Sequence, residues 1–289
     1  MSGAAPVAGG VRGGSRPARA ARLILSGSLL LLFVAPVIAL VTYPSASAYS
    51  SALSDPAVRA SIGFTLLASG VALGVTLLFG VPLGHLLARR GFRGKGVIES
   101  AVALPVVVPH LVAGLALFVV VGPGTPAGSF LARLGVPIFD SLWGVVLVMV
   151  YVSAPYTVLA SELAFRAVDP KLLEAARSLG ASPAAAARTI ALPLALRGVV
   201  AGGLLSWARS VSEIGGFLIL AYTVYPGGGY GGPVTNPLAV LVYAVYEVRL
   251  ADAVAIAALF VIVAFGLFLL VRLLERWGRL PWRAGELPL

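Results

Sequence analysis

Long apolar runs dominate this chain and restrict it to a membrane-spanning fold. Several of them exceed the roughly 18 apolar residues that mark a helix able to cross a bilayer. Of the 289 residues, 59% are hydrophobic and only 11% are charged, whereas soluble domains are about 25% charged. The pattern predicts an all-α polytopic membrane protein with six transmembrane helices, at residues 23–43, 61–88, 97–121, 141–163, 198–223 and 251–274.

Five prolines fall inside these predicted spans, namely Pro36, Pro82, Pro105, Pro109 and Pro155. A proline removes one backbone hydrogen bond from a helix. Within a helix bundle, neighbouring helices and water can satisfy the freed carbonyl group. We therefore expect each span to be a single helix despite these residues. The apolar segment 237–247 is too short to span and is predicted to be an interfacial or re-entrant helix on the external side.

The distribution of basic residues predicts the orientation. Seventeen of the 21 Lys and Arg residues lie in or beside the N-terminal tail, the C-terminal tail and the connections after the second and fourth spans. Because short cytoplasmic segments are enriched in Lys and Arg, both termini and these two connections are predicted to be cytoplasmic. The formal net charge of +10 is explained by this topology, and we expect no nucleic-acid partner.

The N-terminus permits a second interpretation. A basic segment, an apolar run and the small residues Ser45–Ala48 have the order found in a cleaved signal peptide. The apolar run is about 21 residues long, against roughly 7–15 in a signal peptide. We therefore expect this run to be retained as the first span.

The residues that enzymes and ATP-binding proteins need are missing or scattered. The chain has no cysteine, and its two histidines, His85 and His110, are not spaced as metal ligands. It contains no GxxxxGK[ST] phosphate-binding loop. The carboxylates Glu99, Glu162 and Glu213 are distributed singly over different spans. We therefore expect a transport protein rather than an enzyme, with no catalytic, cofactor or metal site.

A polar connection between the fourth and fifth spans, residues 164–197, contains two helix-start signals. Asp169-Pro170 and Ser182-Pro183 each combine a capping side chain with a proline at the first helical position. They predict two short helices, at residues 170–179 and 183–191. The alternative is an ordinary connecting loop.

Two residues bound these short helices. Glycine is common at the position just beyond the end of a helix, and Gly180 occupies that position after the first helix. Pro193 is expected to end the second helix before the fifth span begins. The two helices would form a compact cytoplasmic hairpin whose exposed faces carry Ala and Leu, which suits insertion into a groove of a partner.

The same segment carries a motif. Glu174-Ala175-Ala176 is followed after three residues by Gly180, and after nine more by Ile190-x-Leu192-Pro193. This spacing and its position in the chain resemble the EAA motif of the permease subunits of type I ABC importers. The resemblance covers roughly residues 57–274. It implies a cytoplasmic tail at 1–22, a first transmembrane helix and external loop at 23–56, a permease core at 57–274 with its coupling loop at 164–197, and a cytoplasmic tail at 275–289.

The resemblance also implies a division of labour in the plasma membrane. In such importers the hairpin docks on a separate cytoplasmic ATPase, which binds the ATP and Mg²⁺. Two permease chains, here expected to be identical, assemble with two ATPase subunits and an external solute-binding protein. Closure of the ATPase pair then switches the spans between inward-facing and outward-facing states. The residues assigned to this coupling are Glu174, Ala175, Ala176, Ser178, Leu179, Gly180, Ala181, Ser182, Ile190 and Pro193.

The fifth predicted span contains two charged residues one helical turn apart, Arg209 and Glu213. Charged side chains in a membrane usually face the bundle interior or an aqueous path. At a spacing of four residues they can also pair with each other. The two residues are therefore either a structural ion pair, or Arg209 and neighbouring serines line an anion path or gate. The sequence leaves both interpretations open.

Arg209, Ser212, Glu213 and Gly215 also form an Arg-x-x-Ser-Glu-x-Gly run that looks like the corresponding run of molybdate, tungstate and sulfate permeases. The segment 103–117 is similar to a Leu-Pro…Pro…Ala-Gly-Leu segment of the same group. The resemblance implies a tetrahedral oxyanion as solute. We favour molybdate or tungstate because the chain is short and its external loops are modest, with sulfate or thiosulfate as the alternative.

His110 departs from the pattern of that group, which leads us to expect a second proline or a small residue there. It is either a pathway residue or, as we expect, a buried histidine that packs between helices.

A stand-alone secondary transporter is the alternative of another class. Such transporters usually show inverted repeats with matching broken helices. The sequence shows no convincing internal repeat, and the motif at 174–193 would have no explanation.

Overall fold

The computed structural model describes residues 16–225 and 234–277, and this part of the chain is helical without any strand. The predicted tails at 1–22 and 275–289 lie largely outside these residues. The helices are α1 (Arg16–Thr42), α2 (Ala46–Ser54), α3 (Pro56–Arg89), α4 (Lys95–Val107), α5 (His110–Val121), α6 (Pro126–Arg133), α7 (Leu142–Arg166), α8 (Pro170–Ser178), α9 (Pro183–Ala186), the π-helix η1 (Ala187–Ala191), α10 (Leu192–Val211), α11 (Gly215–Leu220), α12 (Leu238–Tyr246) and α13 (Leu250–Trp277).

The predicted all-α membrane architecture is confirmed. Five helical segments in the described part of the chain are long and apolar enough to cross a bilayer, and a sixth span is possible if the bent pair α4 and α5 is counted as one. Helices α1, α3, α7 and α13 correspond to the first, second, fourth and sixth predicted spans. Pro36, Pro82, Pro105 and Pro155 lie inside helices, as expected. The short apolar segment near residue 240 forms α12.

The prediction of one continuous helix for the third span is wrong. Helices α4 and α5 are separate and meet at an angle of 118°. Val108 has an extended backbone with φ −70° and ψ 129°, and Pro109 caps α5 instead of lying within a helix. The cause is local, because a proline removes a backbone donor and disfavours the helical conformation of the residue before it.

The fifth span also differs from its prediction at both ends. Pro193 does not end a helix, because α9 runs through the π-helical turn η1 into α10 as one segment, Pro183–Val211. In this turn the backbone N–H of Leu192 donates to the carbonyl of Ala187, five residues back, which shifts the hydrogen-bond register just before the proline. At the other end α10 stops at Val211, and the short helix α11 starts anew at Gly215.

Three helices, α3, α7 and α10, form the centre of the bundle through mutual contacts. Small residues allow their backbones to approach closely, as is common between membrane helices. A Cβ atom added at Gly84 of α3 would lie 2.7 Å from the Val158 carbonyl oxygen of α7. A Cβ atom at Gly202 of α10 would lie 2.5 Å from the Cβ atom of Ala160. Polar groups join the same helices, since the Ser206 hydroxyl donates to the Ser153 carbonyl at 3.0 Å.

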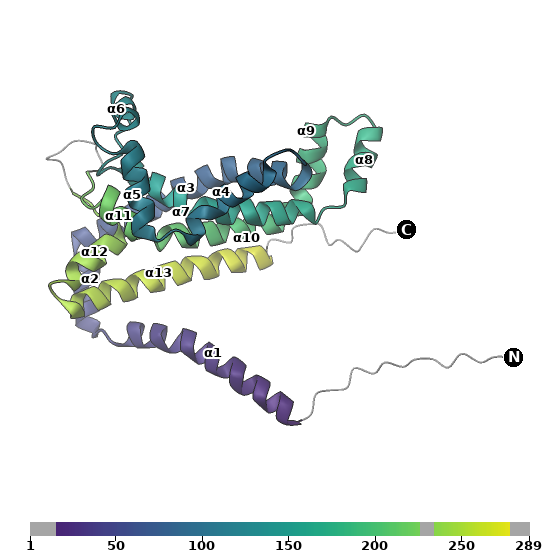
Figure 1. The fold of residues 1–289 in the computed structure, drawn as a ribbon. Helices are drawn as coiled ribbons and strands as arrows, with labels where there is room; N and C mark the ends of the chain where they lie inside the picture. The colour runs from purple at the N-terminus through teal and green to yellow at the C-terminus, as the bar shows by residue number, and fades with distance from the viewer. Residues whose placement is uncertain (1–15, 226–233, 278–289) are drawn as a thin grey trace.

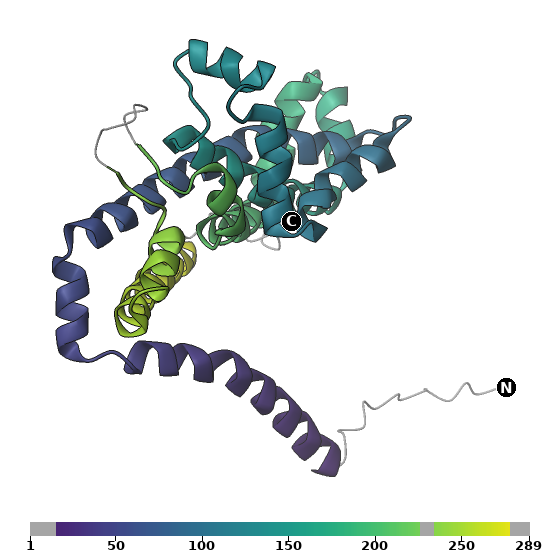
Figure 2. The ribbon, with the colours of Figure 1, turned by 60° about the vertical axis from the view of Figure 1, so that its left-hand side comes forward.

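The remaining helices divide between the two ends of this bundle. Helices α8 and α9 project at one end, whereas α2, α6, α11 and α12 gather at the other (Figure 1). The segment α1 leads into α2 and then α3, and it diverges from the body of the bundle (Figure 2). Although α1 contacts α13, its most apolar stretch is 0% buried. Large apolar side chains of α1 therefore face outward, as suits a lipid environment.

Candidate functional site

The hairpin of α8 and α9 begins and turns as the sequence predicts. The carboxylate of Asp169 accepts a hydrogen bond from the backbone N–H of Lys171 at 2.9 Å, and Pro170 is the first residue of α8. The hydroxyl of Ser182 accepts a hydrogen bond from the backbone N–H of Ala185 at 3.1 Å. Both capping side chains are therefore in place.

Gly180 makes the turn between these helices. Its φ of +92° lies in a region that side chains with a Cβ rarely adopt. Its N–H donates to the Arg177 carbonyl at 3.0 Å, and the N–H of Ala181 donates to the Ala176 carbonyl at 3.0 Å. These paired bonds satisfy the last carbonyl groups of α8 in a Schellman motif. The turn is consequently a fixed structure and not a loose loop.

The motif residues divide between the hairpin and the membrane helix that follows it. Glu174, Ala175, Ala176 and Ser178 lie on α8, and residues 179–182 form the turn. Ile190 lies farther along, in η1, and Pro193 lies in α10. The side chain of Leu179 is 89% exposed at the tip of the hairpin. An apolar tip on a projecting element is the kind of surface that a partner protein covers.

A second group of predicted residues meets where two helices are broken. The Arg209 guanidinium donates to the Glu213 carboxylate at 2.7 Å, although Glu213 lies beyond the end of α10 and not on the same helix. Glu213 is 0% exposed, and its second oxygen accepts a hydrogen bond from the backbone N–H of Gly216 at 2.7 Å. This bond caps the first turn of α11, so the carboxylate both neutralises Arg209 and restarts the chain as a helix after the break.

The expectation that His110 is a buried packing residue is wrong. Its side chain is 47% exposed, and its Nε2 lies 2.7 Å from Nη2 of Arg209. Its Nδ1 lies 3.3 Å from the Glu213 carboxylate. Nδ1 also lies 3.3 Å from the same Nη2 atom of Arg209, so both ring nitrogens are close to the guanidinium group. The break at Pro109 is what places His110 at the start of α5, beside the break between α10 and α11.

Close backbone contact holds these two breaks together. A Cβ atom added at Gly215 would lie 2.6 Å from the Cβ atom of His110. One added at Gly114 would lie 2.9 Å from the Cα atom of Gly216. The hydroxyl of Ser212 completes the group, since Nη1 of Arg209 donates to it at 3.3 Å. Arg209 is 14% exposed, so a guanidinium group lies beside a half-exposed histidine at the edge of the bundle.

The structure contains a further ion-pair network that the sequence did not predict, because Glu99 and Glu162 were interpreted as isolated carboxylates. Arg166 joins them, with its Nη2 atom 3.1 Å from Glu99 of α4 and in contact with Glu162 of α7. Lys95 lies 3.7 Å from Glu99. The four-residue spacing of Glu162 and Arg166 in the sequence could have predicted their ion pair. The network ties α4 to α7 near the end of the bundle that carries α8.

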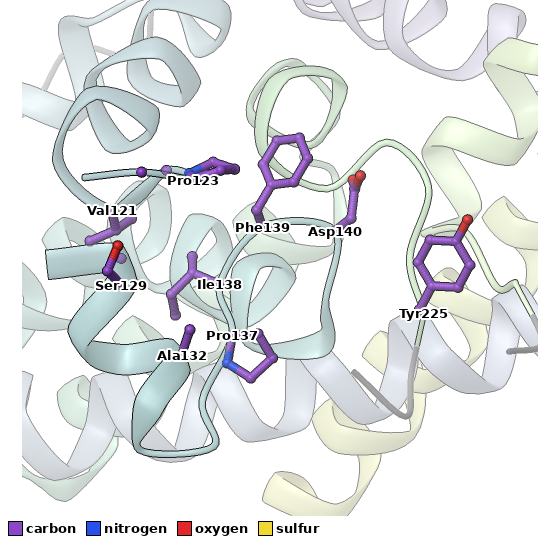
Figure 3. A pocket seen from close by; sticks show the side chains of 12 residues that line it. Val121, Pro123, Ser129, Ala132, Pro137, Ile138, Phe139, Asp140 and Tyr225 are labelled. Atoms are coloured by element: carbon purple, nitrogen blue, oxygen red, sulfur yellow. The ribbon is translucent and has the colours of Figure 1, made fainter. Parts of the chain in front are cut away.

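A cavity of about 200 Å³ lies at the opposite end of the bundle, and the carboxyl group of Asp140 borders it (Figure 3). Asp140 has a positive φ of +48°. Its carboxylate accepts a hydrogen bond from the backbone N–H of Thr223 at 3.3 Å, and its carbonyl accepts one from the N–H of Tyr225 at 3.1 Å. Burial raises the pKa of the Asp140 carboxyl group, against the opposing effect of hydrogen bonds from Thr223 and Tyr222. Asp140 thus fastens the segment after α11 to the start of α7.

The chain is similar to a described protein family and to several transport proteins. Residues 80–279 match the model of the family described as "binding-protein-dependent transport system inner membrane component". A "probable molybdenum ABC transporter permease protein" of Haloferax volcanii is 38% identical over 265 residues, which cover 91% of this chain and 92% of the relative. A "molybdate/tungstate transport system permease protein" of Thermococcus kodakarensis is 36% identical over 228 residues, covering 74% and 86%.

A solved structure has a similar fold at low sequence identity. It is a bacterial alginate ABC transporter in complex with an alginate pentasaccharide-bound periplasmic protein. One of its chains aligns with a TM-score of 0.66 and 18% identity, covering 90% of this chain and 95% of the other. At this identity the likeness concerns the fold alone.

Proposed function

The chain belongs to the family of binding-protein-dependent transport system inner membrane components, and we propose that it is the membrane subunit through which an ATP-driven importer carries molybdate or tungstate. The observation that supports this solute most directly is the 38% identity to the probable molybdenum permease of Haloferax volcanii across 91% of the chain. Family membership agrees with the resemblance found in the sequence, and the chain is a multi-pass membrane transport subunit, not an enzyme.

The α8–α9 hairpin is proposed to dock on a separate ATPase that binds ATP and Mg²⁺. Its capped helices and fixed Gly180 turn support this role, because a rigid projection transmits motion whereas a loose loop absorbs it. The exposed Leu179 supplies an apolar contact at the tip. Two copies of this chain and two ATPase subunits would form the transporter, with an external solute-binding protein at the end that carries α6 and α12.

The proposed topology places α8, α9 and both termini in the cytoplasm. In support, α1 begins and α13 ends on the side of the bundle that carries α8 and α9 (Figure 1). The basic residues concentrated at that end agree with the positive-inside rule. This orientation directs the hairpin toward the compartment in which ATP is available.

Arg209 and His110 are proposed to line the route of the anion. Glu213 is fully buried, whereas His110 is half-exposed and contacts both Arg209 and Glu213. An oxyanion that approaches the exposed imidazole would meet the N–H groups of Arg209 next to it, and it would compete with Glu213 for the same cation. Ser212 and Gly215 would support the site through their contacts with Arg209 and His110.

Purification of a tagged chain from its native membrane tests the coupling role. We expect an ATPase subunit to co-purify with the wild-type chain and to be lost from Gly180→Trp, in which a side chain at φ +92° disrupts the turn. Gly94→Trp is a matched control, since Gly94 has φ +88° but lies in the connection between α3 and α4. An ATPase that remains bound to Gly180→Trp, or that never accompanies a folded wild-type chain, would contradict the proposed docking.

The solute is tested with the purified complex of permease, ATPase and binding protein. Molybdate or tungstate should stimulate ATP hydrolysis, whereas sulfate and thiosulfate at the same concentration should not. Stimulation by sulfate alone would assign the chain to the sulfate group instead.

A further inference from the structure

A cavity of about 410 Å³ lies beneath the α8–α9 hairpin, where the end of α3 meets α8 and α9. Its charged lining is mainly basic. Arg89 and Arg90 come from the end of α3, Arg177 comes from α8, and Glu174 is the one acidic residue that faces them. His85, one turn before Arg89, completes the polar wall. Three guanidinium groups against one carboxylate leave a local formal charge of +2.

These guanidinium groups lack ionic partners within the described part of the chain. None of Arg89, Arg90 and Arg177 belongs to the ion pairs found there within 4.0 Å. Arg89 donates from Nη2 to the Val168 carbonyl at 2.8 Å, but its Nε is buried without any hydrogen-bond partner. A buried donor without a partner destabilises the protein, so an acceptor that enters the cavity and bonds this group is favoured.

Guanidinium groups bind tetrahedral oxyanions well, because their N–H donors form a planar fork that matches two oxygen atoms of one anion. The volume of the cavity is ample for a phosphate-sized group, and the arginines come from two helices that are far apart in the sequence. We propose that this cavity is a binding site for an oxyanion group, presented either by a free tetrahedral anion or by the phosphate of a lipid headgroup.

The cavity and the exposed apolar residues proposed to contact the ATPase lie on different faces of α8, and Glu174 is the motif residue that lines the cavity. The lining residues Pro170, Leu173, Glu174 and Arg177 recur at the three- and four-residue spacing that defines one helix face. Leu172 and Leu179, both exposed, lie on the opposite face at about 100° of rotation per residue. A bound oxyanion would therefore bridge α3 and α8 from inside and hold the hairpin against the bundle. It leaves the outer face available to a partner.

The site goes beyond the proposed transport function, and it depends on that function only for the compartment to which it opens. Its test therefore uses the purified full-length permease without any ATPase. Inorganic phosphate and molybdate are titrated by calorimetry into the delipidated protein, to detect a free anion. In a second arm, native mass spectrometry compares nanodiscs that contain phosphatidylglycerol with nanodiscs that contain only phosphatidylcholine, to detect a lipid headgroup.

We expect saturable binding in at least one arm. The double variant Arg90→Ala/Arg177→Ala should weaken it by about tenfold or more, because two charge-assisted contacts are lost. Arg188→Ala is the control. It removes one positive charge, where the double variant removes two, from the connection that also contains Arg177, and Arg188 lies in η1 and does not line the cavity. Binding to this control should stay within about twofold of wild type.

Three results would overturn the proposal. The first is an absence of saturable binding of phosphate, molybdate and phosphatidylglycerol to the wild-type chain. The second is an equal loss in Arg188→Ala, which would indicate general attraction by a basic surface. The third is unchanged oxyanion binding by the double variant. Transport is tested separately, by stimulation of ATP hydrolysis in the complete complex.

Discussion

At the scale of single residues, the group formed by Arg209, Glu213 and His110 shows what local spacing can and cannot reveal. Arg209 and Glu213 are four residues apart in the sequence, so a pairing between them could be considered from the spacing, although Glu213 lies beyond the end of α10. His110 lies 99 positions from Arg209. No local pattern connects them, and only the break at Pro109 brings the imidazole to the pair.

Loss of Arg209 should destabilise the protein strongly. Arg209→Ala leaves the fully buried Glu213 carboxyl group without its guanidinium partner, and removing one partner of a buried pair costs about 3–5 kcal/mol. Adding Glu213→Gln should recover much of this stability, because a neutral amide oxygen can still accept the bond from Gly216. Thermal unfolding of the purified variants in one detergent measures both effects.

The exposed ion pair of Arg249 and Asp252 provides the comparison. The Arg249 side chain is 75% exposed, so Arg249→Ala should cost less than about 1 kcal/mol. Equal losses for Arg209→Ala and Arg249→Ala would show that the buried pair has no special role.

Asp140 should make the free energy of unfolding increase as the pH falls through the acid range, which is opposite to the usual effect of a carboxyl group. Burial raises the pKa of its carboxyl group above the ordinary value of 3.8, so the folded protein binds the proton more tightly than the unfolded chain does. The ionised group therefore lowers the free energy of unfolding at pH values above its folded pKa. This penalty is relieved as the pH falls through that pKa.

Asp140→Asn should remove this dependence without loss of stability at neutral pH. Asparagine keeps an oxygen acceptor for Thr223 and tolerates the φ of +48°. Asp140→Ala keeps neither property and should be less stable than both. Unfolding temperatures between pH 4 and pH 7 check this order, and an asparagine variant as unstable as the alanine variant would refute it.

At the scale of helices, prediction succeeded where the determinants are adjacent in the sequence. Asp169, Ser182 and Gly180 act on residues two to five positions away, so the hairpin could be anticipated. Pro109 and Pro193 are both visible in the sequence, but they have different effects. Pro109 breaks a span, whereas Pro193 lies just after a π-helical turn within a continuous helical segment. Their different outcomes depend on how neighbouring hydrogen bonds adjust, which hydropathy does not encode.

The close crossing of α3 and α7 gives a test at the same scale. Gly84→Ala would place a Cβ atom 2.7 Å from the Val158 carbonyl oxygen, so it should cost about 1–3 kcal/mol. Gly74→Ala on the same helix has open space and should be neutral or stabilising by up to about 1 kcal/mol. Thermal unfolding of the two single variants distinguishes them. Equal stabilities would show that α3 and α7 do not touch as closely as the structure indicates.

At the scale of the whole molecule, hydropathy and basic-residue counts predicted a helical membrane bundle, because lipid leaves few alternatives for the backbone. They do not identify which helices form the centre, because α3, α7 and α10 pass the same test of length and apolarity as the exposed α1 although they are less apolar, and only their mutual contacts place them there. They also could not reveal the basic cavity under the hairpin, whose arginines come from separate connections. Such features depend on contacts between distant segments.

The central claim is that this chain carries an oxyanion only when a separate ATPase drives it through the α8–α9 hairpin. Uptake of labelled molybdate into liposomes that contain the permease, the ATPase and the binding protein tests this most directly. We predict uptake that requires ATP and the ATPase subunit and that is lost in Gly180→Trp but kept in Gly94→Trp. Uptake by the permease alone, without ATP or the ATPase, would contradict the account and identify a stand-alone transporter.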